Sequence, residues 1–550
     1  MPPASQPHPG DQADRPQASR LRIGDWLLTL LVFFVAGGDA APHRNEAHYL
    51  CRLKHFWDPE WCQGDLFLES PDAHFTVVWL FGWVTLWLSL DATAWLGRFL
   101  SWALLAWGWN RLVWRIAPRP LLAPLGAALL VVVTELMHFA GEWVIGGFEA
   151  KTLAYGLVLL ALRDALDDRW NRAWVLLGGA SALHALVGGW SVVALLFSWA
   201  ICRRRPSLPG MAPGLVVGGL LSLAGVLPAL ALNQGTPPAV VEEANQIYVY
   251  KRLAHHLAPL TKEPEWIARQ AGAHSRLLLA LAVLHAVLVP RMRESRLLQP
   301  ILWWAWGAAA LSATGIAIEL IGKNDPAWAA GLLRYYFFRL SDIAAPIAAI
   351  AVLLALLNEA FDHRRPFAPL LTAALSLGCL LYLADYTRDR LAKPYAPADV
   401  KMIDQAAWVS MCEWVRDNTP EGTVVLTPRL SHTFKWRTGR AEVVTYKDVP
   451  QDAQTLVEWW RRYRDVYQVG EWPETGDPIW TPSLGALGAT RLRQLANDYH
   501  ARYALDQDSL TWTGDYRTRQ VSLPIVHRVG PYTLYDLKPP AAADSKTPSQ

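Results

Sequence analysis

Long apolar runs alternate with short polar stretches along the first two thirds of the chain. Five of them are close to the roughly 20 residues that an α-helix needs to span a bilayer: 119–140, 211–232, 298–321, 343–357 and 366–383. Of the 550 residues, 52% are hydrophobic and 18% are charged, against about 25% charged in an ordinary soluble domain. The pattern predicts a polytopic α-helical membrane protein of about eleven spans.

Lysine and arginine indicate the orientation, because short cytoplasmic segments are enriched in them. The first predicted span covers about residues 24–42, and three arginines precede it. The later clusters are Arg111/Arg115/Arg119, Arg163/Arg169/Arg172, Arg203/Arg204/Arg205, Arg291/Arg293/Arg296 and Arg364/Arg365. If all are cytoplasmic, the number of crossings between successive clusters is even. The N-terminus is then cytoplasmic, and the loop 43–72 is external.

This parity condition decides two ambiguous segments. We assign 94–114 as a span and 74–90 as an apolar juxtamembrane helix on the outer leaflet. The segment 173–202 is too short for two full spans, so we expect a broken or re-entrant hairpin with His184 and Gly188–Gly189 near its apex. A partly helical external loop, 233–274, precedes spans at about 275–290, 298–321, 331–357 and 366–386.

The chain then divides into four parts: a disordered cytoplasmic tail (1–22), a transmembrane domain (23–388), an extracytoplasmic α/β domain (389–538) and a second disordered tail (539–550). In the α/β domain, amphipathic helical patterns at 400–418, 452–468 and 486–500 alternate with β-rich runs at 423–427, 443–446, 502–505, 525–529 and 532–537. Because it has neither a glycine-rich phosphate loop nor a Ser/His/Asp pattern, we interpret it as a recognition or structural module.

Candidate chemistry begins in the loop after the first span. The net charge of +3 and the lack of a basic, aromatic-interleaved stripe argue against a nucleic-acid partner. Glu46 and Tyr49 would share a helix face. A carboxylate held beside apolar walls at the membrane surface can become a base. The alternative is an ordinary polar surface loop.

Further ionisable residues fall on the same predicted outer side. They are Glu142, Glu149, Lys151, His184, Arg334, Arg339 and Asp342. Each has a structural explanation: Arg339 and Asp342 could pair at i, i+3, and Lys151 could snorkel. Together they indicate a site, because charges in spans are costly. We expect an outward-facing cavity with acids on one wall and cations on another, suited to an anionic lipid phosphate.

Three short segments carry a resemblance to a known family. Asn45-Glu46-Ala47-His48-Tyr49 is similar to the Asp-Glu-x-x-Tyr motif after the first span of GT-C glycosyltransferases of the aminoarabinose branch. The segments 414–420 (WVRDNTP) and 530–537 (GPYTLYDL) resemble the opening and closing of the external domain in bacterial members. The resemblance implies a bacterial inner-membrane enzyme that takes sugars from polyprenyl phosphate and gives them to a glycan, lipid or protein.

Carried over residue by residue, the family mechanism implies that Glu46 or Asp65 activates the acceptor. Lys151, Arg339 or Arg334 would hold the departing phosphate. The remaining candidate substrate contacts are His48, Tyr49, His74, Glu142, Glu149, His184 and Asp342. The histidines match no specific metal-ligand spacing, and a divalent metal stays an open alternative. Asn45 replaces the motif's Asp, which puts catalytic activity in question.

Two other functions stay open on the sequence. A transporter or flippase would also place charges in spans, but transporters commonly show related halves with corresponding broken helices, and only one broken segment is evident. An inactive GT-C-like scaffold would fit Asn45. Cys51 and Cys62 share the predicted external loop and are either a disulfide or free thiols.

Overall fold

The computed structural model describes residues 10–203, 205–293, 295–474, 476–508 and 521–538, with side chains from residue 19 onward. It divides into two compact units. The first comprises Met1–Asp39, Ala73–Val77 and Ala94–Pro394, and the second comprises Ala40–Asp72, Val78–Thr93 and Tyr395–Gln550. Of the two predicted tails, residues 1–9 and 539–550 lie outside the described residues. Residues 10–22, which were predicted to belong to the first tail, are helical.

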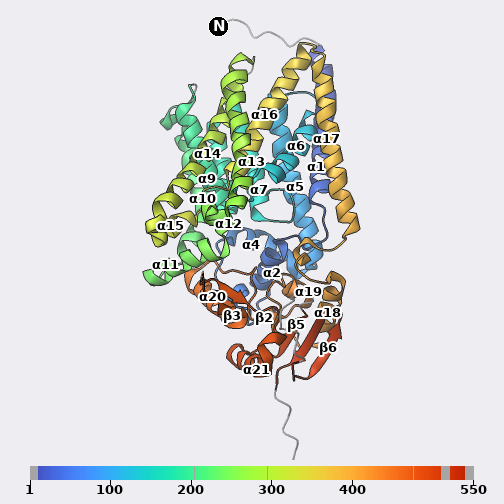
Figure 1. Cartoon of the computed structure of the whole chain (residues 1–550). Helices are drawn as coiled ribbons and strands as arrows, with labels where there is room; N and C mark the ends of the chain where they lie inside the picture. The colour runs from blue at the N-terminus through green and yellow to red at the C-terminus, as the bar shows by residue number, and fades with distance from the viewer. Residues whose placement is uncertain (1–9, 204, 294, 475, 509–520, 539–550) are drawn as a thin grey trace, which may run out of the picture. The chain divides into compact units, whose positions relative to one another are not determined.

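The first unit is helical (Figure 1). Its main helices are α1 (Gly10–Gly37), α5 (from Leu90, in the second unit, to Ile116), α6 (Leu122–Met137), α7 (Ala150–Leu166), α8 (Trp170–Leu183), α9 (Ala185–Ile201), α10 (Leu208–Ala231), α11 (Pro238–Gln246), α12 (Ala254–Leu257), α13 (Pro264–Val283), α14 (Ser295–Ile321), α15 (Pro326–Leu333), α16 (Ser341–Asp362) and α17 (Phe367–Ala392). Five stretches in the described chain are long and apolar enough to cross a membrane: Leu208–Ala231, Pro264–Arg291, Ser295–Asn324, Ser341–Asp362 and Phe367–Ala392. The count of eleven crossings stays a prediction.

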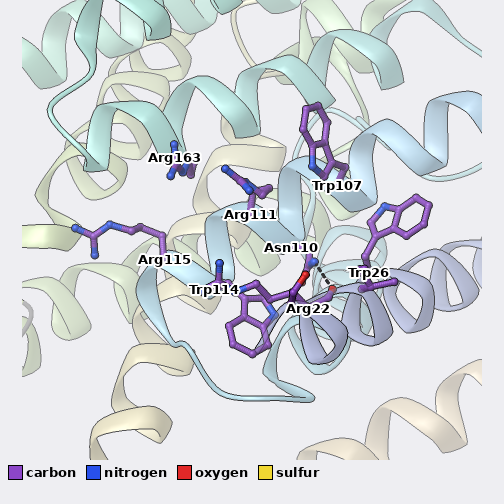
Figure 2. A pocket seen from close by; sticks show the side chains of 10 residues that line it. Arg22, Trp26, Trp107, Asn110, Arg111, Trp114, Arg115 and Arg163 are labelled. Carbon is purple, nitrogen blue, oxygen red and sulfur yellow. Dashed lines mark hydrogen bonds between the residues drawn. The ribbon is translucent and has the colours of Figure 1, made fainter. Parts of the chain in front are cut away.

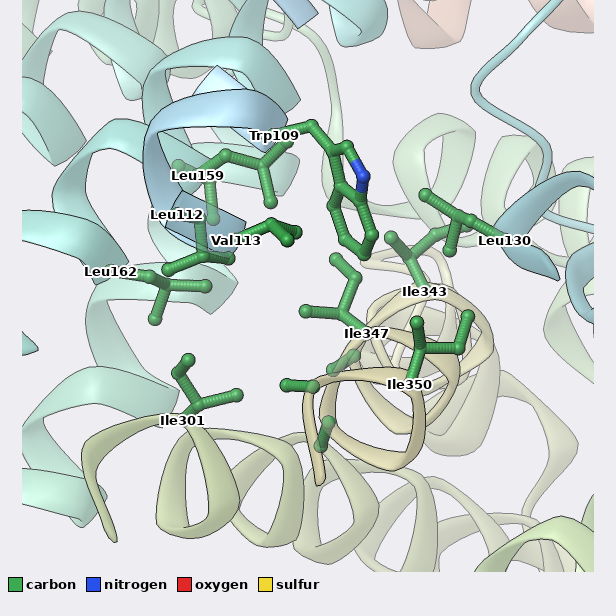
Figure 3. Close-up of a cluster of buried hydrophobic side chains, with 14 of the residues drawn as sticks. Trp109, Leu112, Val113, Leu130, Leu159, Leu162, Ile301, Ile343, Ile347 and Ile350 are labelled. Carbon is green, nitrogen blue, oxygen red and sulfur yellow. The ribbon is translucent and has the colours of Figure 1, made fainter. Parts of the chain in front are cut away.

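Apolar side chains from α5, α6, α7, α14 and α16 form the core of this unit (Figure 3). Trp109, Ile301 and Ile347 are almost fully buried in it. Glycines allow the closest approach between helices. A Cβ at Gly218 of α10 would lie 2.4 Å from the carbonyl oxygen of Trp174 in α8, and one at Gly214 would lie 2.4 Å from that of Asn171. Small residues four apart thus let α8 and α10 pack backbone to backbone.

The predicted helix break within 173–202 is confirmed. The helices α8 and α9 have 14 and 17 residues and meet at His184, which is non-helical. At about 1.5 Å per residue, neither reaches the roughly 30 Å thickness of a hydrocarbon core. Gly188 packs against the backbone of Ser181, so the two helices fold back on each other.

Two element boundaries differ from the sequence predictions. The first helix begins at Gly10 rather than near residue 24, because polar residues without apolar periodicity can still extend a helix nucleated by the apolar run. The predicted continuous span 331–357 is wrong. The helix α15 ends at Leu333 and α16 begins at Ser341, and between them Tyr336 has a positive φ of 58°.

The apolar segment 74–90 forms a short helix, α4 (Phe75–Phe81), followed by a 3₁₀ turn, η1 (Gly82–Leu86), rather than one helix. Trp79, Trp83 and Trp87 are exposed, with 81% of Trp87 accessible. Exposed tryptophans at this spacing are typical of a surface that meets the lipid headgroup region. The position of this segment on the outer leaflet stays a prediction.

The second unit has a five-stranded sheet in the order β2-β1-β5-β7-β6 (Figure 1). The strands are β1 (Val424–Leu426), β2 (Ala441–Glu442), β5 (Tyr503–Gln507), β6 (Ile525–Val529) and β7 (Tyr532–Asp536). A separate antiparallel pair is β3 (Gln468–Glu471) and β4 (Pro478–Trp480). The helices are α2 (Glu46–Trp57), α3 (Leu66–Glu69), α18 (Gln405–Asn418), α19 (Phe434–Thr438), α20 (Ala453–Tyr467) and α21 (Gly488–Tyr499).

In that sheet β1 pairs parallel with β2 and β5, and β7 pairs antiparallel with β5 and β6. Trp408, Phe434 and Tyr532 pack in the core of the unit. The three predicted helices and four of the five predicted strands are present with shifted ends. The predicted strand 443–446 is wrong, since β2 ends at Glu442 and the chain then bends.

Candidate functional site

A buried carboxylate fixes the loop between α6 and α7 in the first unit. Asp342, in the first turn of α16, is fully buried. Its Oδ1 accepts a hydrogen bond from the backbone N–H of Phe139 (2.6 Å), and its Oδ2 accepts from those of Ala140 (2.9 Å) and Glu142 (3.1 Å). Three N–H groups of irregular backbone therefore have a charged partner in the interior.

The same loop carries the other charges of this site. Glu142 Oε2 lies 2.7 Å from Nε of Arg339 and 3.8 Å from Nζ of Lys151. Lys151 also lies 3.3 Å from Glu149 Oε2, and its ammonium sits over the Trp143 ring, 4.1 Å from the centroid. The four charged residues together with Asp342 form what we call the loop cluster.

The loop cluster corrects the expected arrangement of charges. Acids and cations were expected on opposite walls of a cavity, but Lys151 and Arg339 contact Glu142 directly. Glu142, Glu149 and Lys151 are each at most 5% exposed. Direct pairing follows from burial, because a charge in a low-dielectric interior is costly unless it is paired. A cavity of about 50 Å³ adjoins the loop at Trp143.

Two histidines and one arginine from the predicted set lie elsewhere in this unit. His184 caps α9, with its Nδ1 3.3 Å from the backbone N of Val187, and its ring centroid is 5.3 Å from that of His74. Arg334 donates to the side-chain oxygen of Asn245, a neutral amide on α11.

Two further histidines contact the loop cluster and were missed from the sequence. His274 of α13 has Nδ1 3.7 Å from Asp342 Oδ1 and Nε2 3.1 Å from the Ser341 hydroxyl. His256 bonds through Nδ1 to the carbonyl oxygen of Ala140. Both come from the segment 233–274, which was assigned as an external loop, and no spacing pattern singled them out.

A second cluster of buried charges lies in the second unit around Lys435 of α19. Its Nζ is 3.1 Å from Asp65 Oδ2 and 2.9 Å from Glu442 Oε1, and it also contacts Asp448. His48 Nδ1 is 3.1 Å from Asp448 Oδ1. We call these five residues the lysine cluster. One lysine here compensates three carboxylates.

Burial and charge shift the pKa values in the lysine cluster in opposite directions. Burial raises the pKa of Glu442 to about 7 and lowers that of His48 to about 4. Burial alone would lower the pKa of Lys435, but Asp448, Asp65 and Glu442 together raise it well above its usual value. The lysine is therefore charged and His48 neutral near pH 7.

The two candidate bases from the sequence both lie in this unit. Asp65 Oδ1 caps α3 by accepting from the backbone N–H of Phe67 (3.1 Å) and Leu68 (3.0 Å). Its Oδ2 contacts Lys435 and accepts from the backbone N–H of Glu442, and the residue is 1% exposed. These contacts explain Asp65 as a structural residue.

Glu46 is the first residue of α2 and is fully buried. Its Oε2 accepts from the backbone N–H of His43 at 2.6 Å. Asn45, in the place of the motif's Asp, caps the same helix and accepts from Nζ of Lys447 through its side-chain oxygen. The Tyr49 ring lies edge-on to His48, with centroids 5.1 Å apart.

The sequence left a metal site and a Cys51–Cys62 disulfide open. In the part of the chain that the structure describes, no group of three or more His, Cys, Asp or Glu gathers at metal-binding distance. Cys51 and Cys62 are buried free thiols, as are the other three cysteines.

One comparison with known proteins gives a match. A family model described as a domain of unknown function (DUF6798) matches residues 406–466. That stretch contains Lys435, Glu442 and Asp448 of the lysine cluster. No curated protein matches the chain. The family match covers a small part of the chain and assigns it no function.

We expect Asp342→Asn to destabilise the first unit by about 3 kcal/mol, because an amide nitrogen would face backbone donors that now bond to a carboxylate. Thermal unfolding in detergent, followed by tryptophan fluorescence, measures this. The matched control is Asp389→Asn, which alters an exposed acid on α17 that pairs with Arg388. A loss no larger than that of the control would contradict the role given to Asp342.

His48→Asn is expected to change how stability depends on pH. The neutral histidine contributes stability that is present above pH 6.5 and is lost as the pH falls through 4, whereas Glu442 contributes stability that is lost as the pH rises from 4.5 through 7. Removing His48 leaves the second effect alone. As the pH falls from 7 to 4, the free energy of unfolding of the variant should therefore rise by about 3 kcal/mol relative to that of wild type.

Urea unfolding of the full chain, read as exposure of the buried Cys51 thiol, measures the effect of His48→Asn. His500→Asn is the control, because His500 is exposed in the same unit and its left-handed backbone suits asparagine. Parallel pH curves for His48→Asn and wild type would contradict the assignment.

Proposed function

We propose that the protein is a membrane glycosyltransferase that moves a sugar from a polyprenyl-phosphate donor to a glycan, lipid or protein acceptor outside the cytoplasm. The observation that carries the proposal is the loop cluster, where Lys151 is buried, the Arg339 side chain is 19% exposed, and both are already oriented by carboxylates. The resemblance of the segment after the first span to the GT-C motif supports the same class of reaction.

In this mechanism, phosphate recognition is an exchange of partners. Lys151 and Arg339 are paired with Glu142 and Glu149. A donor phosphate would replace carboxylate contacts with phosphate contacts, and a phosphate accepts the same charge-assisted hydrogen bonds. The cations are held in place beforehand by the cluster, so less side-chain entropy is lost on binding.

The transfer itself is a direct displacement. Glu46 removes the proton from the acceptor hydroxyl, and the acceptor oxygen forms a bond to the anomeric carbon. The bond from that carbon to the phosphate oxygen breaks, and the polyprenyl phosphate leaves with the electron pair. The charge of the leaving phosphate requires cations, and Lys151 and Arg339 of the first unit are the candidates for this role. Glu46 is proposed as the base because it follows Asn45 in the segment that resembles the family's acidic motif.

A second candidate function is transport, favoured by one specific observation. The first unit has two breaks, at His184 and at 334–340, where sequence reasoning identified one. Broken helices commonly surround the substrate site of transporters. A transporter would move a polyprenyl-linked substrate across the bilayer without forming a new glycosidic bond, so the chemical product distinguishes the two functions.

Glu46→Gln is expected to abolish sugar transfer, because an amide cannot accept the acceptor's proton, while folding and membrane insertion persist. The assay is formation of glycosylated product in membranes supplied with undecaprenyl-phosphate-linked sugars. Glu421→Gln, an exposed glutamate of the same unit, is the control. Full transfer by Glu46→Gln would exclude Glu46 as the base, and a wild-type protein that translocates donor without product would favour transport.

The double substitution Lys151→Met with Glu149→Gln tests phosphate recognition. Lys151→Met alone would leave Glu149 buried without its lysine, at a cost of about 3–5 kcal/mol, so both charges are removed together. We expect the double variant to fold and to bind undecaprenyl phosphate about tenfold more weakly or worse by native mass spectrometry.

The matched control for the Lys151 variant is Lys54→Met with Asp58→Asn, which removes a partly exposed ion pair of 3.7 Å. Unchanged binding by the double variant would remove Lys151 from the proposal while leaving the test of Glu46 unaffected.

A further inference from the structure

A cavity of about 690 Å³ lies in the first unit, away from the residues assigned to sugar transfer. Three helices line it: α1, the last turns of α5 and the end of α7 (Figure 2). Its lining residues are Ser19, Arg22, Ile23, Trp26, Trp107, Asn110, Arg111, Trp114, Arg115 and Arg163. Four arginines and three tryptophans therefore surround one open hollow, and no acid is among the described side chains that line it.

The four arginines differ in how their charges are compensated. Arg163 lies 2.6 Å from Asp164 and 2.8 Å from Asp167, and Arg115 also pairs with Asp167. In the described part of the chain, neither the Arg22 nor the Arg111 guanidinium forms an ion pair with a carboxylate or a hydrogen bond. Two guanidinium groups are thus available to an anion that enters the cavity.

One of the two available arginines, Arg22, is set in a frame formed by Trp114 and Asn110. The Arg22 guanidinium lies over the Trp114 ring, 5.2 Å from its centroid, and the backbone oxygen of Arg22 accepts from Asn110 Nδ2 at 2.9 Å. Trp114 is fixed in turn by donating from Nε1 to Asp25 (3.0 Å). Figure 2 shows the Arg22, Asn110 and Trp114 side chains close together beside Arg111. The frame positions Arg22 without neutralising it.

The rim of the cavity is apolar and exposed. Ile23 is 54% exposed and Trp107 is 48% exposed. Tryptophan is enriched where protein meets lipid headgroups, because the ring is apolar and its N–H can bond to water or phosphate. An exposed apolar rim beside uncompensated arginines fits a ligand with a phosphate at one end and acyl chains at the other.

Contacts place this cavity at the end of the unit where other basic clusters gather. Arg119, just after α5, lies 2.9 Å from Asp362 at the end of α16, and Arg172 lies 3.2 Å from Asp164. The positive-inside argument predicts that this end is cytoplasmic, and the cytoplasmic leaflet is where anionic lipids attract basic segments.

We propose that this cavity binds the phosphate headgroup of an anionic phospholipid, with Arg22 and Arg111 as the phosphate ligands. Each guanidinium offers parallel N–H donors that match two phosphate oxygens. Trp107 and Ile23 contact the beginning of the acyl chains. This lipid site does not depend on the proposed sugar transfer.

The test compares two phospholipids that carry the same phosphodiester but differ in the net charge of the headgroup. The full-length protein in mixed nanodiscs of phosphatidylglycerol and phosphatidylcholine is released into native mass spectrometry, and retained lipids are identified. We expect wild type to retain phosphatidylglycerol over phosphatidylcholine. The variant Arg22→Gln with Arg111→Gln should lose that preference about tenfold or more.

The control is Arg364→Gln with Arg365→Gln, which removes the same charge from exposed residues between α16 and α17. It should retain the wild-type preference within about twofold if binding is local rather than a general effect of charge. An equal loss in both variants would overturn the site. Displacement of the retained lipid by inorganic phosphate at millimolar concentration would overturn the lipid assignment in favour of a soluble phosphate.

Discussion

The carboxylate of Asp342 is the interaction on which the arrangement of the first unit's charges depends. A loop that leaves helical geometry inside a packed helical unit exposes backbone N–H groups that need partners. Asp342 supplies them for Phe139, Ala140 and Glu142. Because the Glu142 N–H is one of the three, its side chain is held where Arg339 and Lys151 can reach it. The positions of two cations therefore follow from one acid.

The two units solve the same electrostatic problem differently. In the first, three carboxylates are balanced by two cations and by backbone N–H groups at Asp342. In the second, one lysine serves three carboxylates. Burial raises the pKa of Glu442 and keeps His48 neutral, although Asp448 favours the protonated form of His48. Burying a neutral acid costs less free energy than burying an unpaired charge. The protonation of the lysine cluster therefore changes between about pH 4 and pH 7.

Sequence reasoning reached features that depend on local patterns or on charge distribution. The break at His184 followed from a segment too short for two spans, and the strands β6 and β7 followed from the β-rich runs 525–529 and 532–537. The break at 334–340 has no such signal, because the segment contains neither proline nor glycine, and its two arginines and four aromatic residues are all compatible with a helix. A β-prone run of valine and threonine likewise predicted a strand at 443–446 that the chain does not form.

The pairing of charges could not be predicted for a different physical reason. Glu142 and Arg339 are far apart in sequence, and so are His48 and Asp448, so no helix or strand periodicity relates them. Sequence reasoning grouped the first pair only by predicted side of the membrane. It overlooked Lys435, Glu442 and Asp448 because polar residues beside short strands are ordinary in a soluble α/β domain.

Pairing also determines how any ligand can enter the loop cluster. Lys151 and Arg339 already have partners, so an incoming group must replace a carboxylate rather than fill a vacant position. An incoming cation would add positive charge beside Lys151 and Arg339, whose carboxylate partners are already paired. A phosphate can take over the contacts of Glu142 or Glu149 with these cations, because it offers the same kind of acceptor oxygens. The released carboxylate then has to be solvated or protonated, which couples phosphate recognition to water or proton access at this loop.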